Sequence, residues 1–227
     1  MREKRISIKG IIEEFKNDWM IIMLIIGSLA AGAAIYPHLP EQIPSHWNVH
    51  GQVDQYSSRL WGALGLPLLS AGIYIMMVLL PSIDPRRENY KRFKGAYRSI
   101  KSVLVIFFVG LWVMVMVSSL GYSIPVDRFV IVGIGLLFMV VGNFMGQLRN
   151  NYFVGIKTPW TLASEEVWRK THRLSSRVWV ACGGLIALTG LILGGEKGVL
   201  FIGASIAAAV IIPVVYSYII FRRRDAA

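Results

Sequence analysis

Six long apolar stretches without a charged side chain constrain the fold of this chain more than any other feature of its sequence. A helix needs about 20 apolar residues to cross the roughly 30 Å hydrocarbon layer of a membrane, because every backbone N–H and C=O group must be hydrogen-bonded within the segment. The sequence therefore predicts an all-α, polytopic membrane protein with six transmembrane helices. The six stretches are residues 19–36, 60–80, 103–121, 129–148, 178–193 and 199–221.

The amino-acid composition agrees with this prediction. Hydrophobic residues make up 55% of the chain and charged residues only 16%, whereas a soluble domain carries about 25% charged residues. The single cysteine, Cys182, excludes a secreted disulfide scaffold, and we interpret it as a packing residue of the fifth stretch. No stretch has an ionisable side chain in its middle, which disfavours a proton-coupled pump or an ion path.

Lys and Arg are distributed unevenly among the segments that flank and connect the six stretches. All but three of the 24 basic residues lie in the N-terminal segment, in the connectors after the second and fourth stretches, or in the C-terminal tail. The other three connectors hold only Arg59, Arg128 and Lys197. Because cytoplasmic loops carry the excess of Lys and Arg, the sequence predicts that both termini face the cytoplasm. The net charge of +11 then reflects contact with anionic lipid headgroups and requires no nucleic-acid partner.

The connector between the first two stretches is predicted to form a compact exterior cap. Pro37, Pro40 and Pro44 disfavour a helix and favour an extended or turning path. Residues 48–51 read Asn-Val-His-Gly, and the glycine at the end tolerates a positive φ. We therefore expect a turn at these four residues.

Three side chains of the cap have two interpretations. His46, His50 and Asp54 are spaced by four residues and are residue types that bind divalent metal ions. Alternatively, His46 and Asp54 form a hydrogen bond within the cap while Trp47 lies at the membrane interface. We expect no metal and no other cofactor, with His46, His50 and His172 as the candidate ligands if a metal is bound.

The connector between the fourth and fifth stretches carries the densest pattern. Gly155 and Pro159 predict a tight turn, and Ser164 resembles the N-cap of a new helix with Glu165 and Glu166 in its first turn. We expect this to be a short helix that lies along the membrane surface before the fifth span begins.

That expected helix has a stripe formed by Trp168, His172, Ser175 and Trp179. In one interpretation the tryptophans anchor the helix at the interface, and His172 is hydrogen-bonded to a polar group such as Asn143 or Thr158. In the other, the connector is a recognition surface for a cytoplasmic partner. The residues of that surface are Asn143, Arg149, Asn151, Thr158, Trp160, Glu166 and His172.

Enzymatic chemistry has little support in the sequence. No G-x-S-x-G, Walker A, H-E-x-x-H or C-x-x-C motif occurs, and we assign no catalytic residue. Glu166 and His172 are six residues apart, so one helix places them on nearly opposite faces. A metal-dependent membrane hydrolase that uses His46, His50 or His172 stays an alternative. A small-solute transporter is another, although the spans offer few polar groups to line a path.

Two segments of the chain resemble the SdpI family of bacterial membrane immunity proteins. Residues 39–54, which include Ile43-Pro44-Ser45-His46-Trp47-Asn48, resemble the DUF1648 pattern near the N-terminus of those proteins. Residues 142–172, which include Gly155-Ile156-Lys157-Thr158-Pro159-Trp160-Thr161, resemble the SdpI signature itself. The family usually has Arg where this chain has Lys157. The positive charge is kept, but the pair of parallel hydrogen bonds that a guanidinium group can donate is lost.

The resemblance implies a non-enzymatic protein of the cell membrane. Its best-studied members protect a cell from a secreted peptide toxin, and some also hold a cytoplasmic transcriptional repressor at the membrane. By this resemblance, residues 1–100 form a DUF1648-like region with two transmembrane helices and the cap. Residues 101–227 form an SdpI-like region with four helices and the cytoplasmic signature.

The same resemblance implies two sets of site residues. The exterior set would meet the toxin and consists of Pro44, His46, Trp47, Asn48 and Asp54. The cytoplasmic set would meet a partner or carry the signature. It consists of Asn143, Arg149, Asn151, Gly155, Thr158, Pro159, Trp160, Glu166, Trp168 and His172.

Overall fold

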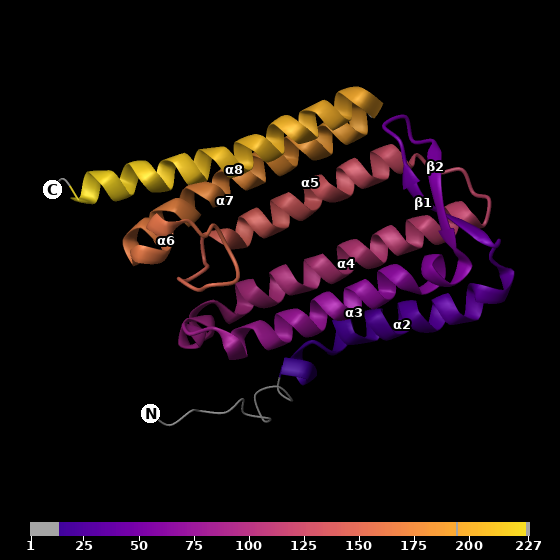
Figure 1. Ribbon diagram of the computed structural model, residues 1–227, viewed down its shortest axis with the longest axis horizontal. Coiled ribbons are helices and arrows are strands. Elements are labelled where there is room, and N and C mark those ends of the chain that lie inside the picture. The colour runs from indigo at the N-terminus through magenta and orange to yellow at the C-terminus, as the bar shows by residue number, and fades with distance from the viewer. Residues whose placement is uncertain (1–13, 194, 226–227) are drawn as a thin grey trace. The chain divides into compact units, whose positions relative to one another are not determined.

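A computed structural model describes residues 14–193 and 195–225 of the chain (Figure 1). Within these residues, six helices are long and apolar enough to cross a membrane, as the sequence predicts. Four of the N-terminal cations that enter the predicted orientation (Arg2, Lys4, Arg5 and Lys9) lie outside the described residues. The six helices are α2 (Trp19–Ile35), α3 (Arg59–Ile83), α4 (Lys94–Ser119), α5 (Val126–Met145), α7 (Glu165–Ile192) and α8 (Gly195–Asp225).

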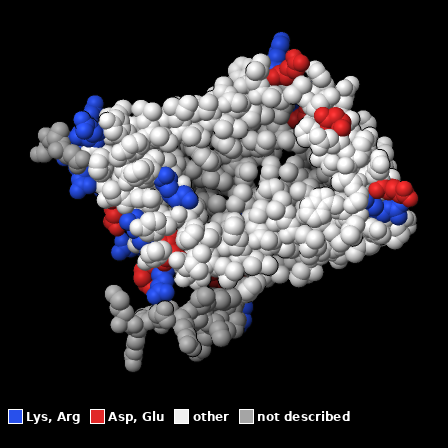
Figure 2. All heavy atoms as spheres, in the orientation of Figure 1, with Lys and Arg blue, Asp and Glu red and all other residues white. Residues whose placement is uncertain are grey.

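Charged side chains lie near the ends of these helices. On the face drawn in Figure 2, Lys, Arg, Asp and Glu gather where helices begin or end, and the helix middles carry none of them. This pattern is what a hydrocarbon layer demands of the segments that cross it. The chain is a multi-pass membrane protein.

The connector between α2 and α3 contains a β-hairpin, so the prediction of a purely α-helical chain is incomplete. After the 3₁₀ turn η1 (Tyr36–His38), strands β1 (Gln42–Trp47) and β2 (Val53–Ser58) pair in a two-stranded sheet. The Asn48 side-chain oxygen accepts hydrogen bonds from the N–H groups of His50 (2.9 Å) and Gln52 (3.0 Å), and Gly51 has a φ of 75°. The predicted turn at residues 48–51 is confirmed.

The described chain divides into two compact units. The first consists of residues up to 46, 53–83 and 104–124, and therefore contains α2, α3 and the second half of α4. Gly32 of α2 lies against the backbone of Ala63 in α3, where any side chain would collide. The Trp112 indole N–H of α4 donates to the Ala63 carbonyl at 2.8 Å, which ties α4 to α3.

The second unit consists of residues 47–52, 84–103 and 125 onward. Its helices α5 and α7 approach closely because Gly135 and Gly183 each lie against the backbone of the other helix. Small residues allow this contact in membranes, where helices gain stability from packing rather than from the hydrophobic effect. Trp179 of α7 stacks on Phe138 of α5 and donates its indole N–H to the Ala209 carbonyl of α8 at 2.9 Å.

The predicted short interfacial helix is not a separate element. The Ser164 hydroxyl accepts from the Val167 N–H at 3.3 Å, as expected of an N-cap, but α7 then continues unbroken to Ile192. Its Trp168 and His172 side chains are buried, so the stripe packs against protein and needs no bend toward lipid. The short helix of this connector is α6 (Pro159–Ala163), with Pro159 in its first turn.

Candidate functional site

The loop between α5 and α7, which we call the signature loop (residues 146–164), folds around a buried asparagine. Asn151 is 0% exposed, and its side-chain oxygen accepts from the N–H groups of Phe153 (2.9 Å) and Val154 (2.7 Å). Its amide nitrogen donates to the carbonyls of Arg149 and Val154, both at 2.9 Å. One side chain therefore replaces the hydrogen bonds that this segment of irregular backbone would otherwise make with water.

The loop next passes over His172, at a position that requires glycine. Gly155 has a φ of 119°, and a Cβ atom there would overlap the Nε2 atom of His172. The Ile156 N–H donates to that same Nε2 atom at 3.0 Å. Gly155 thus lets the backbone come close enough for the imidazole to hold it.

Hydrogen bonding determines the charge of His172. Its Nδ1 atom lies 2.8 Å from the Trp168 carbonyl oxygen and must donate to it, while Nε2 accepts from Ile156. A ring with one donating and one accepting nitrogen is neutral. The ring also stacks on Trp168, with centroids 4.0 Å apart, and is 0% exposed.

These contacts correct the expected partners of His172, which were Asn143 or Thr158. The partners are backbone groups of Ile156 and Trp168, because the loop lies directly on the ring. Both nitrogens are occupied, so this arrangement leaves neither of them to bind a metal. The Trp168 indole N–H in turn donates to the Leu148 carbonyl at 2.9 Å, which fixes the start of the loop.

Two threonines close the other end of the signature loop. Thr158 caps α6 by accepting from the Thr161 N–H, and the Thr161 hydroxyl donates to the Ile156 carbonyl at 2.8 Å. The Thr158 hydroxyl also lies 3.1 Å from the Ser217 hydroxyl of α8. Trp160 contacts the Tyr218 ring of the same helix, with centroids 5.0 Å apart. The loop is therefore attached to α8 as well as to α7.

The sequence did not point to the residues that brace the loop from the α3–α4 connector (residues 84–93), which includes η2 (Arg87–Phe93). Asp84 is 2% exposed, and its carboxylate accepts from the Tyr90 hydroxyl (3.0 Å), the Tyr152 N–H (2.9 Å) and the Arg86 N–H (2.7 Å). An acid beside a proline, in a connector otherwise crowded with cations, was the signal that could have singled out Asp84.

Arg86 continues this contact between the connector and the loop. Its guanidinium group donates to the Asn150 side-chain oxygen and to the Leu162 carbonyl, and lies 4.6 Å from the centre of the Tyr152 ring. The Asn89 amide donates to the Asn150 carbonyl at 2.7 Å. The sequence had marked Arg86 only as one of many orienting charges.

The cytoplasmic set of predicted residues thus separates into two groups. Asn151, Thr158, Trp168 and His172 are buried in the network, and Gly155 is required by it. The others are exposed or, for Trp160, half-buried, and the Glu166 carboxylate pairs with Lys170 at 2.7 Å. The exposed or half-buried group is Asn143, Arg149, Pro159, Trp160 and Glu166.

The exterior set lies on the hairpin. The His46 Nδ1 atom is 2.6 Å from the Asp54 carboxylate, which is the hydrogen bond that one interpretation predicts. The His50 Nε2 atom instead lies 3.5 Å from the Glu196 carboxylate. Pro44 and Trp47 are half-buried in β1, and Asn48 forms the turn. Among the described residues, no three His, Cys, Asp or Glu side chains are placed to hold a metal ion.

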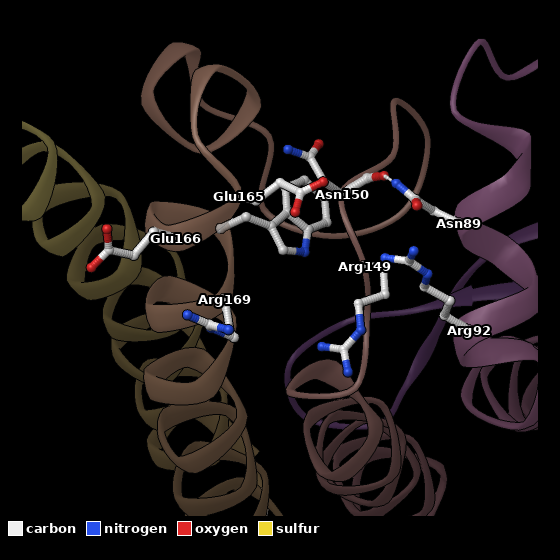
Figure 3. A pocket seen from close by; sticks show the side chains of 8 residues that line it. Asn89, Arg92, Arg149, Asn150, Glu165, Glu166 and Arg169 are labelled. Carbon is white, nitrogen blue, oxygen red and sulfur yellow. Dashed lines mark hydrogen bonds between the residues drawn. The ribbon is translucent and has the colours of Figure 1, made fainter.

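An open cleft of about 630 Å³ lies where the signature loop, η2 and the start of α7 meet, all within the second unit. Figure 3 shows Arg92, Arg149 and Arg169 around it, one from each of these elements, with the Glu166 side chain directed away from them. The remaining lining residues are Asn89, Asn150, Glu165 and Trp168.

Six helices that are long and apolar enough to cross a membrane, with a buried polar network around the loop between α5 and α7, define a polytopic helical membrane protein. Residues 147–217 match the SdpI/YfhL protein family, and residues 23–71 match a domain of unknown function, DUF1648. The chain is 26% identical over 208 residues to the immunity protein SdpI of Bacillus subtilis (strain 168), which covers 92% of this chain and 97% of that protein. No solved structure matches it. These sequence matches support membership of the SdpI family.

Proposed function

We propose that this chain is a membrane immunity protein that protects a cell from a secreted peptide toxin. The observation that carries the proposal is the similarity to the immunity protein SdpI along almost the full length of both chains. The family-matched segment, residues 147–217, also contains most of the buried network around Asn151 and His172.

We further propose that both termini face the cytoplasm, which places the hairpin outside and the signature loop inside. The distribution of Lys and Arg supports this orientation. Labelling of intact cells with a membrane-impermeant thiol reagent tests it in a background in which Cys182 is replaced by Ala. We expect Trp47→Cys to react from outside and Trp160→Cys to react only after permeabilisation. The reverse pattern contradicts the orientation.

In this proposal the toxin meets the hairpin at Pro44, His46, Trp47, Asn48 and Asp54. The exposure of His46 and Asp54, at 59% and 42%, supports a role in recognition rather than in holding the fold. The hairpin belongs to an N-terminal DUF1648-like region, residues 1–100, and the signature loop to an SdpI-like region, residues 101–227. Membrane lipids are the second class of partner.

The finer part of the proposal is a signalling role for the signature loop. A cytoplasmic transcriptional repressor would contact the exposed or half-buried group of signature residues, while the buried group holds the loop that presents them. Toxin binding changes that surface only if the chain has two arrangements and the toxin binds one of them more tightly. Pull-down of the repressor encoded nearest to this chain, with and without toxin, tests the role.

Expression in a toxin-sensitive cell tests immunity itself. We expect survival to rise above that of cells with an empty vector, and to rise far less for a double variant, His46→Ala with Trp47→Ala, present in the membrane at equal amount. A survival curve unchanged by the unmodified chain, across a panel of secreted peptide toxins, contradicts the proposal.

A further inference from the structure

The cleft of the second unit gathers three guanidinium groups that the fold does not use. Arg92, Arg149 and Arg169 come from η2, the signature loop and α7, and all three side chains line the same opening (Figure 3). Within the residues that the structure describes, none of the three forms a side-chain hydrogen bond or ion pair. Arg86 differs from these three arginines, because its guanidinium group donates hydrogen bonds to the Asn150 side-chain oxygen and the Leu162 carbonyl.

Like charges are not gathered at one opening for stability, because cations facing the same space repel one another. Two carboxylates also line the cleft, but Glu166 pairs with Lys170 at 2.7 Å and its side chain points away, which leaves Glu165 as the lining carboxylate without an ion pair among the described residues. One carboxylate does not neutralise three guanidinium groups. The cleft therefore keeps an excess of positive charge.

The first turn of α7 adds to the positive electrostatic potential of the cleft. Glu165, Glu166, Trp168 and Arg169 belong to its first two turns, and all four line the cleft. A 28-residue helix carries a partial positive charge at its N-terminus, which favours an anion there. Cationic side chains and a helix N-terminus together favour an anion with several hydrogen-bond acceptors over a single carboxylate.

We propose that this cleft binds a phosphate group, presented either by an anionic lipid headgroup or by a free phosphate compound. Guanidinium groups bond phosphate oxygens in pairs, and three of them around one opening match the several oxygens of that anion. Arg149 is the first residue after the fourth apolar stretch, at the depth where lipid headgroups lie. The proposal does not depend on toxin immunity or on the orientation of the chain.

Direct binding to the purified full-length chain tests this site. The chain is kept in a non-ionic detergent at constant ionic strength and titrated by calorimetry with inorganic phosphate, with short-chain phosphatidylglycerol, and with short-chain phosphatidylcholine of the same acyl length. We expect the two anionic probes to bind and phosphatidylcholine to bind at least tenfold more weakly. Tighter binding of phosphatidylglycerol than of phosphate identifies a lipid as the source, and equal binding identifies a free phosphate compound.

Matched variants separate the cleft from general surface charge. Arg149→Gln and Arg169→Gln should each weaken binding of the anionic probe about tenfold. Arg173→Gln, one turn along α7, and Lys94→Gln, just after η2, remove the same charge from residues that do not line the cleft and should weaken it less than twofold. Glu165→Gln should strengthen binding severalfold, which no unfolded variant would do.

Three results overturn the proposal. One is no binding of either anionic probe by the folded chain. Another is equal weakening by the cleft variants and the control variants. The third is binding of an acidic peptide such as tetraglutamate in the absence of any phosphate binding, which would assign the cleft to a protein partner.

Discussion

The hairpin carries His46 and the helix α7, on which the signature loop packs, carries His172; the sequence marks both as candidates, and the structure treats the two differently. His46 is 59% exposed on its side chain and bonds one exposed carboxylate, whereas His172 is 0% exposed and bonded at both ring nitrogens. Exposed polar pairs contribute little to stability, and buried ones are costly to break. The hairpin is therefore free to change contacts with a partner, while the loop is a structural element whose interior specifies one conformation.

The largest expected effect is that of Gly155→Ala. The new Cβ atom would overlap His172, and the positive φ is itself unfavourable for alanine at a cost of about 1–3 kcal/mol. Together with the lost Ile156 hydrogen bond, we expect the free energy of unfolding to fall by about 3 kcal/mol. Thermal unfolding of the purified chain in detergent measures it.

The matched control for this prediction is Gly184→Ala. This glycine lies in the middle of α7, where an added Cβ meets no atom within 4 Å, and alanine favours a helix. We expect the control to be as stable as the unmodified chain. Equal unfolding temperatures for both variants would show that the loop does not need its close approach to His172.

The next largest effect is that of Asp84→Ala. The change leaves the Tyr152 N–H without its acceptor and the Tyr90 hydroxyl with only the longer, 3.4 Å contact to the Asn151 side-chain oxygen, at a cost of about 2–3 kcal/mol. Tyr90→Phe removes only one of these hydrogen bonds and should cost about 1 kcal/mol. Hydrogen exchange shows which hydrogen bond is lost, since the Tyr152 amide should lose its protection in Asp84→Ala and keep it in Tyr90→Phe. Unchanged protection in both would contradict the bracing role of Asp84.

The helices, the hairpin and the loop differ in how much of their structure can be predicted from the sequence. The spans are predictable to within a few residues at most ends, because each apolar run carries its own signal. Two helices are exceptions, since α7 begins 13 residues and α4 nine residues before its apolar run. The hairpin turn is predictable because Asn48 and Gly51 act locally.

The interior of the loop is less predictable, because its partners are distant or are backbone groups. His172 and Asn151 stand out in the sequence, but the N–H groups that they hold carry no residue-specific signal. Asp84 meets Tyr152 across 68 positions, in a connector whose cations suggested only topology. Hydrogen bonds of this kind are determined by tertiary packing rather than by a local pattern.

A smaller effect is expected where the loop is attached to α8. Thr158→Val and Ser217→Ala each remove a hydroxyl from a buried pair, and Thr158 loses its capping role as well. We expect a double-mutant cycle to give a coupling of about 1 kcal/mol between the two sites. A coupling indistinguishable from zero would mean that the 3.1 Å contact contributes nothing to the attachment.

The smallest effect on stability, and the clearest separation of the two regions, is expected for His46→Gln. The exposed pair with Asp54 should be worth no more than about 0.5 kcal/mol, so thermal unfolding should hardly change. If the hairpin meets the toxin, however, survival of toxin-treated cells should fall, since an amide does not reproduce the histidine–carboxylate contact. Gln55→Ala, at the next position of β2, is the control and should leave both stability and survival unchanged. A His46→Gln variant that is destabilised as strongly as Asp84→Ala would contradict this prediction. The hairpin, like the loop, would then be stabilised by its polar side chains, and the contrast between the two histidines would no longer separate recognition from structure.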